Sequence, residues 1–204
     1  MAASSTKPGK HAVRLVSTAV LAILFVALLF TSAVAAETPV RPSILAGQWY
    51  VADPAALAAE VAGFISRAGT VRLSGPLKAV VVPHAGHIYS GPVAAYGYAA
   101  LKDADVKTVI MVGPSHHAAF PGVSVNVMDY QTPLGIVRVD RELAEEMIEK
   151  GQGLVSSQPE VHAREHCIEI QLPFLQVVKK PARFVPVVMG HQDLEYCRAL
   201  AAVL

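Results

Sequence analysis

Hydrophobic and polar positions follow two different spacings along this chain, and the spacings predict helices and strands in turn. Residues 54–66 have apolar positions at helical spacing, with Asp53 as N-cap and proline at the first helical position. Residues 77–82 and 107–113 are apolar runs typical of buried strands. Residues 92–101 between them favour a helix. These segments predict one strand–helix–strand unit, whose crossover should be right-handed.

The same alternation continues to the end of the chain. The pattern predicts strands at residues 123–128, 136–139 and 184–189, and helices at 141–150 and from 194 onwards. An amphipathic segment at residues 164–179 contains Pro173, which must kink or break a helix at that point. Alternating strands and helices predict an α/β fold, with a mixed or largely parallel sheet flanked by helices.

The first 36 residues have the pattern of a targeting segment. Three basic residues, Lys7, Lys10 and Arg14, precede an uninterrupted apolar run at residues 20–30, and an Ala-Val-Ala cleavage signal follows. The pattern predicts a signal peptide or, because residues 15–36 carry no charge, a membrane anchor. Either would make the protein periplasmic, extracellular or membrane-anchored. The next segment, 37–43, contains two prolines and is predicted to be a linker, which leaves 44–204 as the folded domain.

Charge and cysteine content narrow the classes of partner. The whole chain has 17 Lys and Arg against 16 Asp and Glu, and without the three basic residues of the N-terminal segment the balance is 14 against 16. This balance, with no basic cluster, argues against a nucleic-acid partner.

Cys167 and Cys197 either form one disulfide in an oxidising compartment or are two free thiols, and the sequence leaves both readings open.

Two predicted strands each lead into a loop that carries histidine. The strand at residues 77–82 is followed by Pro83 and His84, and the strand at 107–113 by Pro114, Ser115 and His116. Loops at the carboxyl ends of parallel strands share one edge of a sheet, where ligands and metals commonly bind. His84 and His116 are therefore predicted to be a pair of metal ligands, suited to Fe(II), Cu or Zn.

Further polar residues are candidates for the same site. His117 is a proton carrier, a substrate contact or a surface group, and the sequence does not separate these readings. Glu165 is either a carboxylate that orients the imidazole of a neighbouring ligand or a helix-capping carboxylate beside a packed histidine, and the sequence leaves both readings open. His166 is a second candidate for moving protons. A competing motif, His162-Ala163-Arg164-Glu165-His166, fits the His-x-x-Glu-His pattern of zinc metallopeptidases, in which both histidines lie on one helix. That reading is weak because Pro159 and Glu160 suggest that His162 precedes the helix.

Five blocks of sequence, in order, resemble the Memo family, also called AmmeMemoRadiSam system protein B. The resemblance covers residues 43–204 and is carried by Ala46-Gly47-Gln48-Trp49-Tyr50, by Pro83-His84-Ala85-Gly86 with Tyr89-Ser90-Gly91, by Gly113-Pro114-Ser115-His116-His117, by Thr132-Pro133-Leu134-Gly135 and by Glu165-His166-Cys167-Ile168-Glu169-Ile170-Gln171-Leu172-Pro173-Phe174. The family is similar in fold to the class III extradiol dioxygenases, which are non-heme iron enzymes. Its metal site uses the histidine of the second block, the first histidine of the His-His pair and a C-terminal cysteine. Carried over, the first two are His84 and His116, and no position of this chain matches the third.

The resemblance implies two alternative functions. One is a metal-dependent oxidoreductase of dioxygenase type, in which His84 and His116 hold Fe(II) and His117 or His166 moves protons. The other is a metal-binding or interaction module of the same fold without that catalysis, with AMMECR1-like and radical S-adenosylmethionine proteins as the implied partners. Because the family pattern continues with a Ser-Asp-x-x-His block and the ligand cysteine, the chain is expected to be a fragment of a longer domain.

Overall fold

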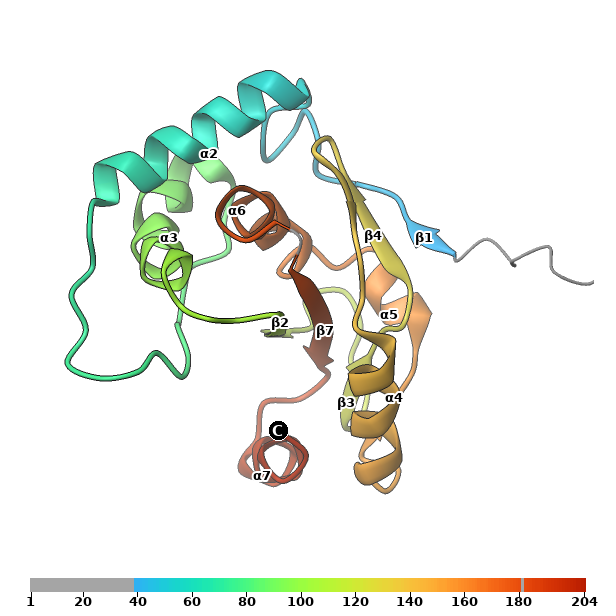
Figure 1. The fold of residues 1–204 in the computed structure, drawn as a ribbon. Coiled ribbons are helices and arrows are strands. Elements are labelled where there is room, and N and C mark those ends of the chain that lie inside the picture. Colours follow the sequence, from blue (N-terminus) through green and yellow to red (C-terminus); the bar gives the residue numbers. More distant parts are fainter. Residues whose placement is uncertain (1–38, 181) are drawn as a thin grey trace, which may run out of the picture. The chain divides into compact units, whose positions relative to one another are not determined.

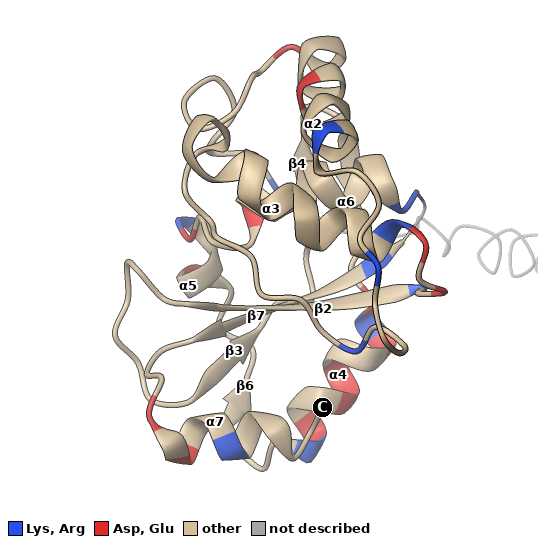
Figure 2. Ribbon diagram, turned by 90° about the vertical axis from the view of Figure 1, so that its left-hand side faces the viewer, with Lys and Arg blue, Asp and Glu red and all other residues tan. Residues whose placement is uncertain are grey.

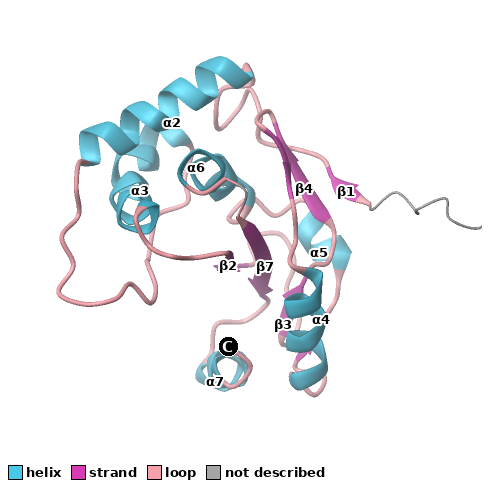
Figure 3. Ribbon diagram, in the orientation of Figure 1, coloured by secondary structure: helices cyan, strands magenta, loops and turns pink. Residues whose placement is uncertain are grey.

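A four-stranded mixed sheet forms the centre of the computed structural model, which describes residues 39–180 and 182–204 (Figures 1 and 3). Its strand order is β2–β7–β3–β6, where the strands are Thr108–Pro114, Arg183–Met189, Val123–Val125 and Val155–Ser156. β2 and β7 run parallel over seven residue pairs, β3 is antiparallel to β7, and β6 is parallel to β3. The sheet is therefore mixed, as the sequence predicted.

A second, three-stranded sheet has the order β1–β4–β5. Its strands are Val40–Arg41, Asp129–Thr132 and Gly135–Val137. β4 and β5 form an antiparallel hairpin, and β1 pairs in parallel with β4. β1 lies within the predicted linker at 37–43, so part of that segment belongs to the folded unit, Thr38–Leu204.

Six helices in the described residues cover the strands. They are α2 (Pro54–Ala68), α3 (His87–Lys102), α4 (Arg141–Lys150), α5 (Pro159–Ala163), α6 (Leu172–Val178) and α7 (Leu194–Ala201), with a 3-10 turn η1 at Glu169–Gln171. Asp53 and Asp140 cap α2 and α4 as predicted, because each carboxylate accepts a hydrogen bond from a backbone N–H of the first turn. α2, α3 and α6 pack together on one side of the central sheet and α7 lies on the other (Figure 1). β7 runs between these layers, so six of its seven residues are buried.

The predicted strand at residues 77–82 is wrong. This segment has no strand pairing, and the side chain of Val81 is fully exposed. Its other valines pack against α3, where a side-chain atom on Gly97 would collide with Val82 and contact Val80. An apolar β-branched run favours an extended backbone, but a strand also requires a neighbouring backbone to bond. Here contact with a helix takes the place of that pairing.

Two helix boundaries also differ from those predicted. α3 begins at His87 rather than at residue 92, because Gly86 starts the helix and Pro92 is tolerated within it. The segment 164–179 is not one kinked helix: residues 164–168 are irregular, and Pro173 lies in the first turn of α6. Proline lacks the N–H that a first helical turn leaves unbonded, so it begins this helix instead of breaking it.

A buried ion pair joins β1 to η1. Arg41 and Glu169 are 2% and 0% exposed, and Arg41 Nη1 donates to Glu169 Oε2 at 2.5 Å. Glu169 also accepts hydrogen bonds from the Tyr50 hydroxyl and from the backbone N–H groups of Ile44 and Leu45. The carboxylate therefore holds residues 41–50 against the segment that carries His166.

His162 is buried in the core between β3 and β4. Its Nδ1 shares a hydrogen bond with the Tyr130 hydroxyl and its Nε2 one with the Ser124 hydroxyl, both at 3.1 Å. Burial lowers the pKa of His162 to about 4, and the nearby Arg41 guanidinium acts in the same direction. The imidazole is therefore neutral in the folded protein at neutral pH.

This burial should make the stability of the protein depend on pH. The His162 pKa is about 4 when folded and about 6.5 when unfolded, so the unfolded chain binds more protons between these values. The contribution is fully present above about pH 6.5 and is lost as the pH falls toward 4, by about 3 kcal/mol in total. Urea unfolding across this range measures it. His162→Gln should reduce the slope of unfolding free energy against pH, and equal slopes in the two proteins would contradict the assignment.

Candidate metal centre

Two histidines from distant parts of the sequence meet just beyond the end of β2. His84 lies in the loop before α3 and His116 two residues after β2, and their Nε2 atoms are 3.4 Å apart. Two nitrogens that bind one tetrahedral ion at about 2.1 Å would lie ~3.4 Å from each other. The spacing of this pair therefore fits a shared metal ion.

Glu165 fixes the orientation of His116. Its Oε1 accepts a hydrogen bond from His116 Nδ1 at 2.8 Å, and its Oε2 accepts one from the His116 backbone N–H at 2.7 Å. Because a carboxylate only accepts, the His116 proton lies on Nδ1, and the lone pair of Nε2 faces His84. The sequence-based prediction that Glu165 orients a neighbouring imidazole is confirmed.

The electrostatics of Glu165 support this role. Burial by itself raises the pKa of the carboxyl, but hydrogen bonds from His116 and from the backbone N–H groups of Cys167 and His166 outweigh it and lower the pKa to about 2. The group is therefore a carboxylate throughout the physiological range. Its negative charge favours a cation bound to the far side of the His116 ring.

His166 completes a group of three imidazoles. Its ring centroid lies 4.1 Å from that of His116 and 5.9 Å from that of His84, and one nitrogen from each ring lies within 4.8 Å of the others. Burial is the largest cause that lowers the pKa of His84 and of His166. Neighbouring imidazoles lower it further, and the Glu165 carboxylate opposes them without reversing the direction. Both are therefore neutral near pH 7, which is the form of histidine that binds metals.

A second group of donors, His116, Glu165 and Cys167, also lies within 4.8 Å, but it fits a metal less well. Burial, together with the charge of Glu165, raises the pKa of the Cys167 thiol, which donates to the Pro114 carbonyl. Glu165 already accepts from four N–H groups. Metals bind thiolates rather than thiols, so the three-histidine group is the better candidate.

The local sequence explains how these loops come together. A side chain at Gly113 would collide with Cys167. Glycine at this position lets residues 165–168 lie directly against the end of β2, which brings Glu165 next to His116. In the loop that carries His84, the His87 backbone N–H donates to the Trp49 carbonyl. Glycine at position 86 lets this loop lie close to Trp49, because a Cβ there would come within 3.3 Å of the same carbonyl oxygen.

The remaining histidines near the motifs lie outside the three-imidazole group. The exposed His117 ring stands roughly perpendicular to that of His166, with centroids 5.8 Å apart. His87 points into the core, where it bonds Glu60 and the Ile170 carbonyl. His162 is in α5, with both ring nitrogens bonded in the core, so it cannot bind a metal together with His166. The structure thus gives no support to the metallopeptidase reading.

Sequence reasoning did not identify two other contacts of the site, and both residues lie within the Memo-like blocks. Trp49 packs against His166, with ring centroids 4.7 Å apart. Gln171 Nε2 donates to the Pro83 carbonyl beside His84, while its buried Oε1 has no partner in the described residues. The only sequence signal for either was its place in a block. Cys167 and Cys197 are both free thiols, the first buried and the second exposed.

Comparison with known proteins identifies relatives over most of the chain. A MEMO1 family protein of Methanopyrus kandleri is 39% identical over 176 residues, which are 80% of this chain and 61% of the relative. One of Thermoplasma volcanium is 35% identical over 167 residues, covering 81% and 61%. One of Methanosarcina barkeri is 41% identical over 160 residues, covering 76% and 56%. The chain thus spans about 60% of the length of these relatives.

The predicted localisation is corrected by these comparisons. The relatives match this chain as MEMO1 family proteins and lend no support to export or membrane anchorage. Residues 15–36, on which the prediction was based, lie outside the described residues. Across 39–180 and 182–204, no helix has both the length and the apolar character needed to cross a bilayer.

The family assignment rests on the length of the match as well as on its blocks. The family model described as Memo-like protein matches residues 41–204, which include all three clustered histidines, Glu165 and both flanking residues, Trp49 and Gln171. The mixed α/β architecture agrees with this match. The chain belongs to the Memo family.

Proposed function

We propose that this chain binds one transition-metal ion through His84, His116 and His166, with Fe(II) foremost and Cu or Zn as alternatives. The observation that carries the proposal is the 3.4 Å approach of two imidazole Nε2 atoms, one of which is oriented by a buried carboxylate. Among the described residues, His166 is the third donor that lies close enough to His84 and His116 to bind the same ion.

The donor set is suited to this class of metal. Imidazole binds Fe, Cu and Zn, and three protein ligands leave coordination positions open to solvent or substrate. The His116 side chain is 34% exposed, so a small molecule can reach the group from outside. When bound, the metal would supply redox or Lewis-acid chemistry to such a molecule.

We further propose that the activity is that of a metal-dependent oxidoreductase of dioxygenase type. Three residues of this chain would shape the site that the substrate enters. Glu165 holds His116, and Gln171 holds the His84 loop through Pro83. Trp49 bounds the site beside His166. His117 stands next to His166 and is exposed, so its imidazole can exchange a proton with substrate and solvent. The AMMECR1-like and radical S-adenosylmethionine partners are proposals that rest on family membership.

Metal titration compares the two neighbouring histidines directly. The wild-type protein is titrated with Fe(II) under anaerobic conditions, and separately with Cu and Zn, and bound metal is measured after dialysis. One ion per chain is expected. His166→Ala should weaken binding at least about tenfold because it removes a ligand, whereas His117→Ala should bind like wild type.

Two outcomes would contradict the proposal. If the wild-type protein retains no stoichiometric metal, the site is not a metal centre. If His166→Ala and His117→Ala bind equally well, then His166 is not a ligand. Oxygen consumption by the iron-loaded protein with catechols tests the oxidoreductase step. Stable metal binding without turnover would instead assign the chain to the non-catalytic class.

A further inference from the structure

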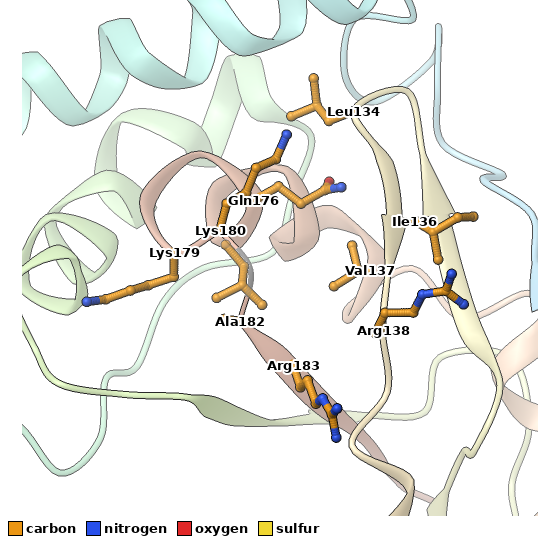
Figure 4. Close-up of a pocket in the computed structure, with 10 residues that line it drawn as sticks. Leu134, Ile136, Val137, Arg138, Gln176, Lys179, Lys180, Ala182 and Arg183 are labelled. Atoms are coloured by element: carbon orange, nitrogen blue, oxygen red, sulfur yellow. The ribbon is translucent and has the colours of Figure 1, made fainter.

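A cavity of about 440 Å³ lies at the opposite end of the central sheet from the histidines. It is bounded by β5, by the end of α6 and by the first residue of β7, Arg183 (Figure 4). Arg183 pairs with Thr108, the first residue of β2, whereas His116, which the other two histidines adjoin, follows the last residue of that strand. At about 3.3 Å per residue, a seven-residue strand separates the two places by ~20 Å. The cavity is therefore separate from the candidate metal centre.

The charged side chains of this cavity are all basic. They are Arg138, Lys179, Lys180 and Arg183, and no carboxylate lines the cavity. Figure 2 shows Lys and Arg positions beside the end of α6 and at the adjoining end of the sheet, with Asp or Glu positions among them. A second cavity, of about 470 Å³, adjoins the same lysines and Arg183 and adds one cation, Lys107, and one carboxylate, Asp140. The region therefore carries a local excess of positive charge.

Two of these cations are already engaged by protein groups. Arg138 Nη1 donates to Asp129 at 2.7 Å, and Lys179 donates to the Ala104 carbonyl, directed away from the other basic side chains (Figure 4). Lys180 and Arg183 are exposed, and neither forms an ion pair within the described part of the chain. They are the two charges left for a ligand.

The other wall of the cavity is apolar and firmly held. Val137 and Leu175 are buried there, and Leu134 and Ile136 are partly exposed. The amide of Gln176 is bonded to the Thr132 hydroxyl and to the Gly135 carbonyl, which ties α6 to the β4–β5 turn. The wall thus offers a preformed surface to an organic group, in a volume typical of small-molecule sites.

We propose that this cavity binds a small phosphate monoester. The phosphate would be bound by Arg183, whose planar guanidinium makes paired hydrogen bonds to phosphate oxygens. Lys180 extends toward Leu134, away from Arg183 (Figure 4), and its flexible side chain would turn toward the phosphate to add a second charge. The organic part would pack against Leu134, Ile136 and Val137. A phosphate monoester carries close to two negative charges at neutral pH, which matches the two unpaired cations better than a carboxylate does.

Calorimetric titration of the metal-free protein with n-butyl phosphate tests this site. Inorganic phosphate, butyrate and butanol serve as the probes that separate charge from apolar contact. Butyl phosphate should bind severalfold more tightly than inorganic phosphate, because its chain buries apolar surface. Butyrate should bind more weakly than butyl phosphate, and butanol should not bind measurably.

Variants locate the binding. Arg183→Ala should weaken butyl phosphate binding about tenfold, because it removes a charge-assisted bidentate contact, and Lys180→Glu should weaken it further by reversing a charge. Arg198→Ala, an exposed arginine on α7, is the matched control and should bind like wild type. Circular dichroism and thermal unfolding establish that each variant is folded. These substitutions are at exposed positions, so the fold should be retained.

Three results would overturn the proposal. The first is the absence of saturable binding below about 10 mM butyl phosphate. The second is equal binding by the Arg183→Ala and Arg198→Ala proteins. The third is loss of binding in His116→Ala with no loss in Arg183→Ala, which would place the phosphate at the histidines. Because the titration uses metal-free protein, its outcome is independent of the proposed metal function.

Discussion

Replacing either His84 or His116 by alanine is expected to reduce transition-metal affinity at least about a hundredfold, because each change removes one ligand from a set of three. The two Nε2 atoms face one another at 3.4 Å across the position proposed for the ion. Removing either ring therefore removes a nitrogen that the other ring does not replace. Competition with a chromophoric chelator measures the affinity. Both side chains are at least partly exposed, so the folded structure should survive each substitution.

His191 provides the matched control for this experiment. It is exposed, and its ring lies beside Tyr196, with centroids 6.3 Å apart, rather than in the three-imidazole group. His191→Ala should therefore leave the metal affinity unchanged. Equal metal retention in His84→Ala, His116→Ala and His191→Ala would refute the ligand assignment.

Replacing Glu169 by alanine is expected to lower the free energy of unfolding by about 3–5 kcal/mol. The carboxylate is fully buried and pairs with Arg41, and its loss leaves a buried guanidinium without its counter-charge. Backbone N–H groups at Ile44 and Leu45 lose their acceptor as well. For a domain of this size, such a loss is a large fraction of the total stability. Urea unfolding at constant pH measures the change.

Two variants show whether the unpaired charge is the cause. Glu146→Ala removes an exposed partner of Lys150 and should change stability by no more than about 0.5 kcal/mol. Adding Arg41→Met to Glu169→Ala should recover part of the loss, because the buried cation is then absent. If Glu169→Ala is as stable as Glu146→Ala, the ion pair does not hold β1 to η1 as described.

Local chemistry allowed much of the fold to be predicted. Asp53 and Asp140 were identified as helix caps because a short carboxylate before an apolar periodic segment satisfies backbone donors within the same few residues. The strands that became β2 and β7 were recognisable because both are apolar, β-branched runs. β7 is buried as such a run predicts, whereas β2 lies at the edge of the sheet and is only partly buried. Pairing is not local, however. The run at residues 77–82 has similar composition, and it remained unpaired because a helix, rather than a strand, lies against it.

The candidate site divides in the same way. Its two leading histidines could be found from sequence because each follows an apolar run, and Glu165 because it precedes a further histidine within a family block. The choice among the other imidazoles depended on tertiary structure. His166 joins the group because the absence of a side chain at Gly113 lets its loop lie against β2, while His87 and His162 bond to core partners instead.

The sequence by itself therefore determined the α/β alternation, the helix caps, the Memo-like blocks and the His84–His116 pair, since each depends on neighbouring residues or on a motif. Only the tertiary structure decided which backbone segments pair, which imidazoles converge, that Arg41 meets Glu169 across 128 positions, and that Lys180 and Arg183 border a cavity. The physical reason is that burial and charge pairing depend on contacts between residues far apart in sequence. Local propensity does not specify such contacts.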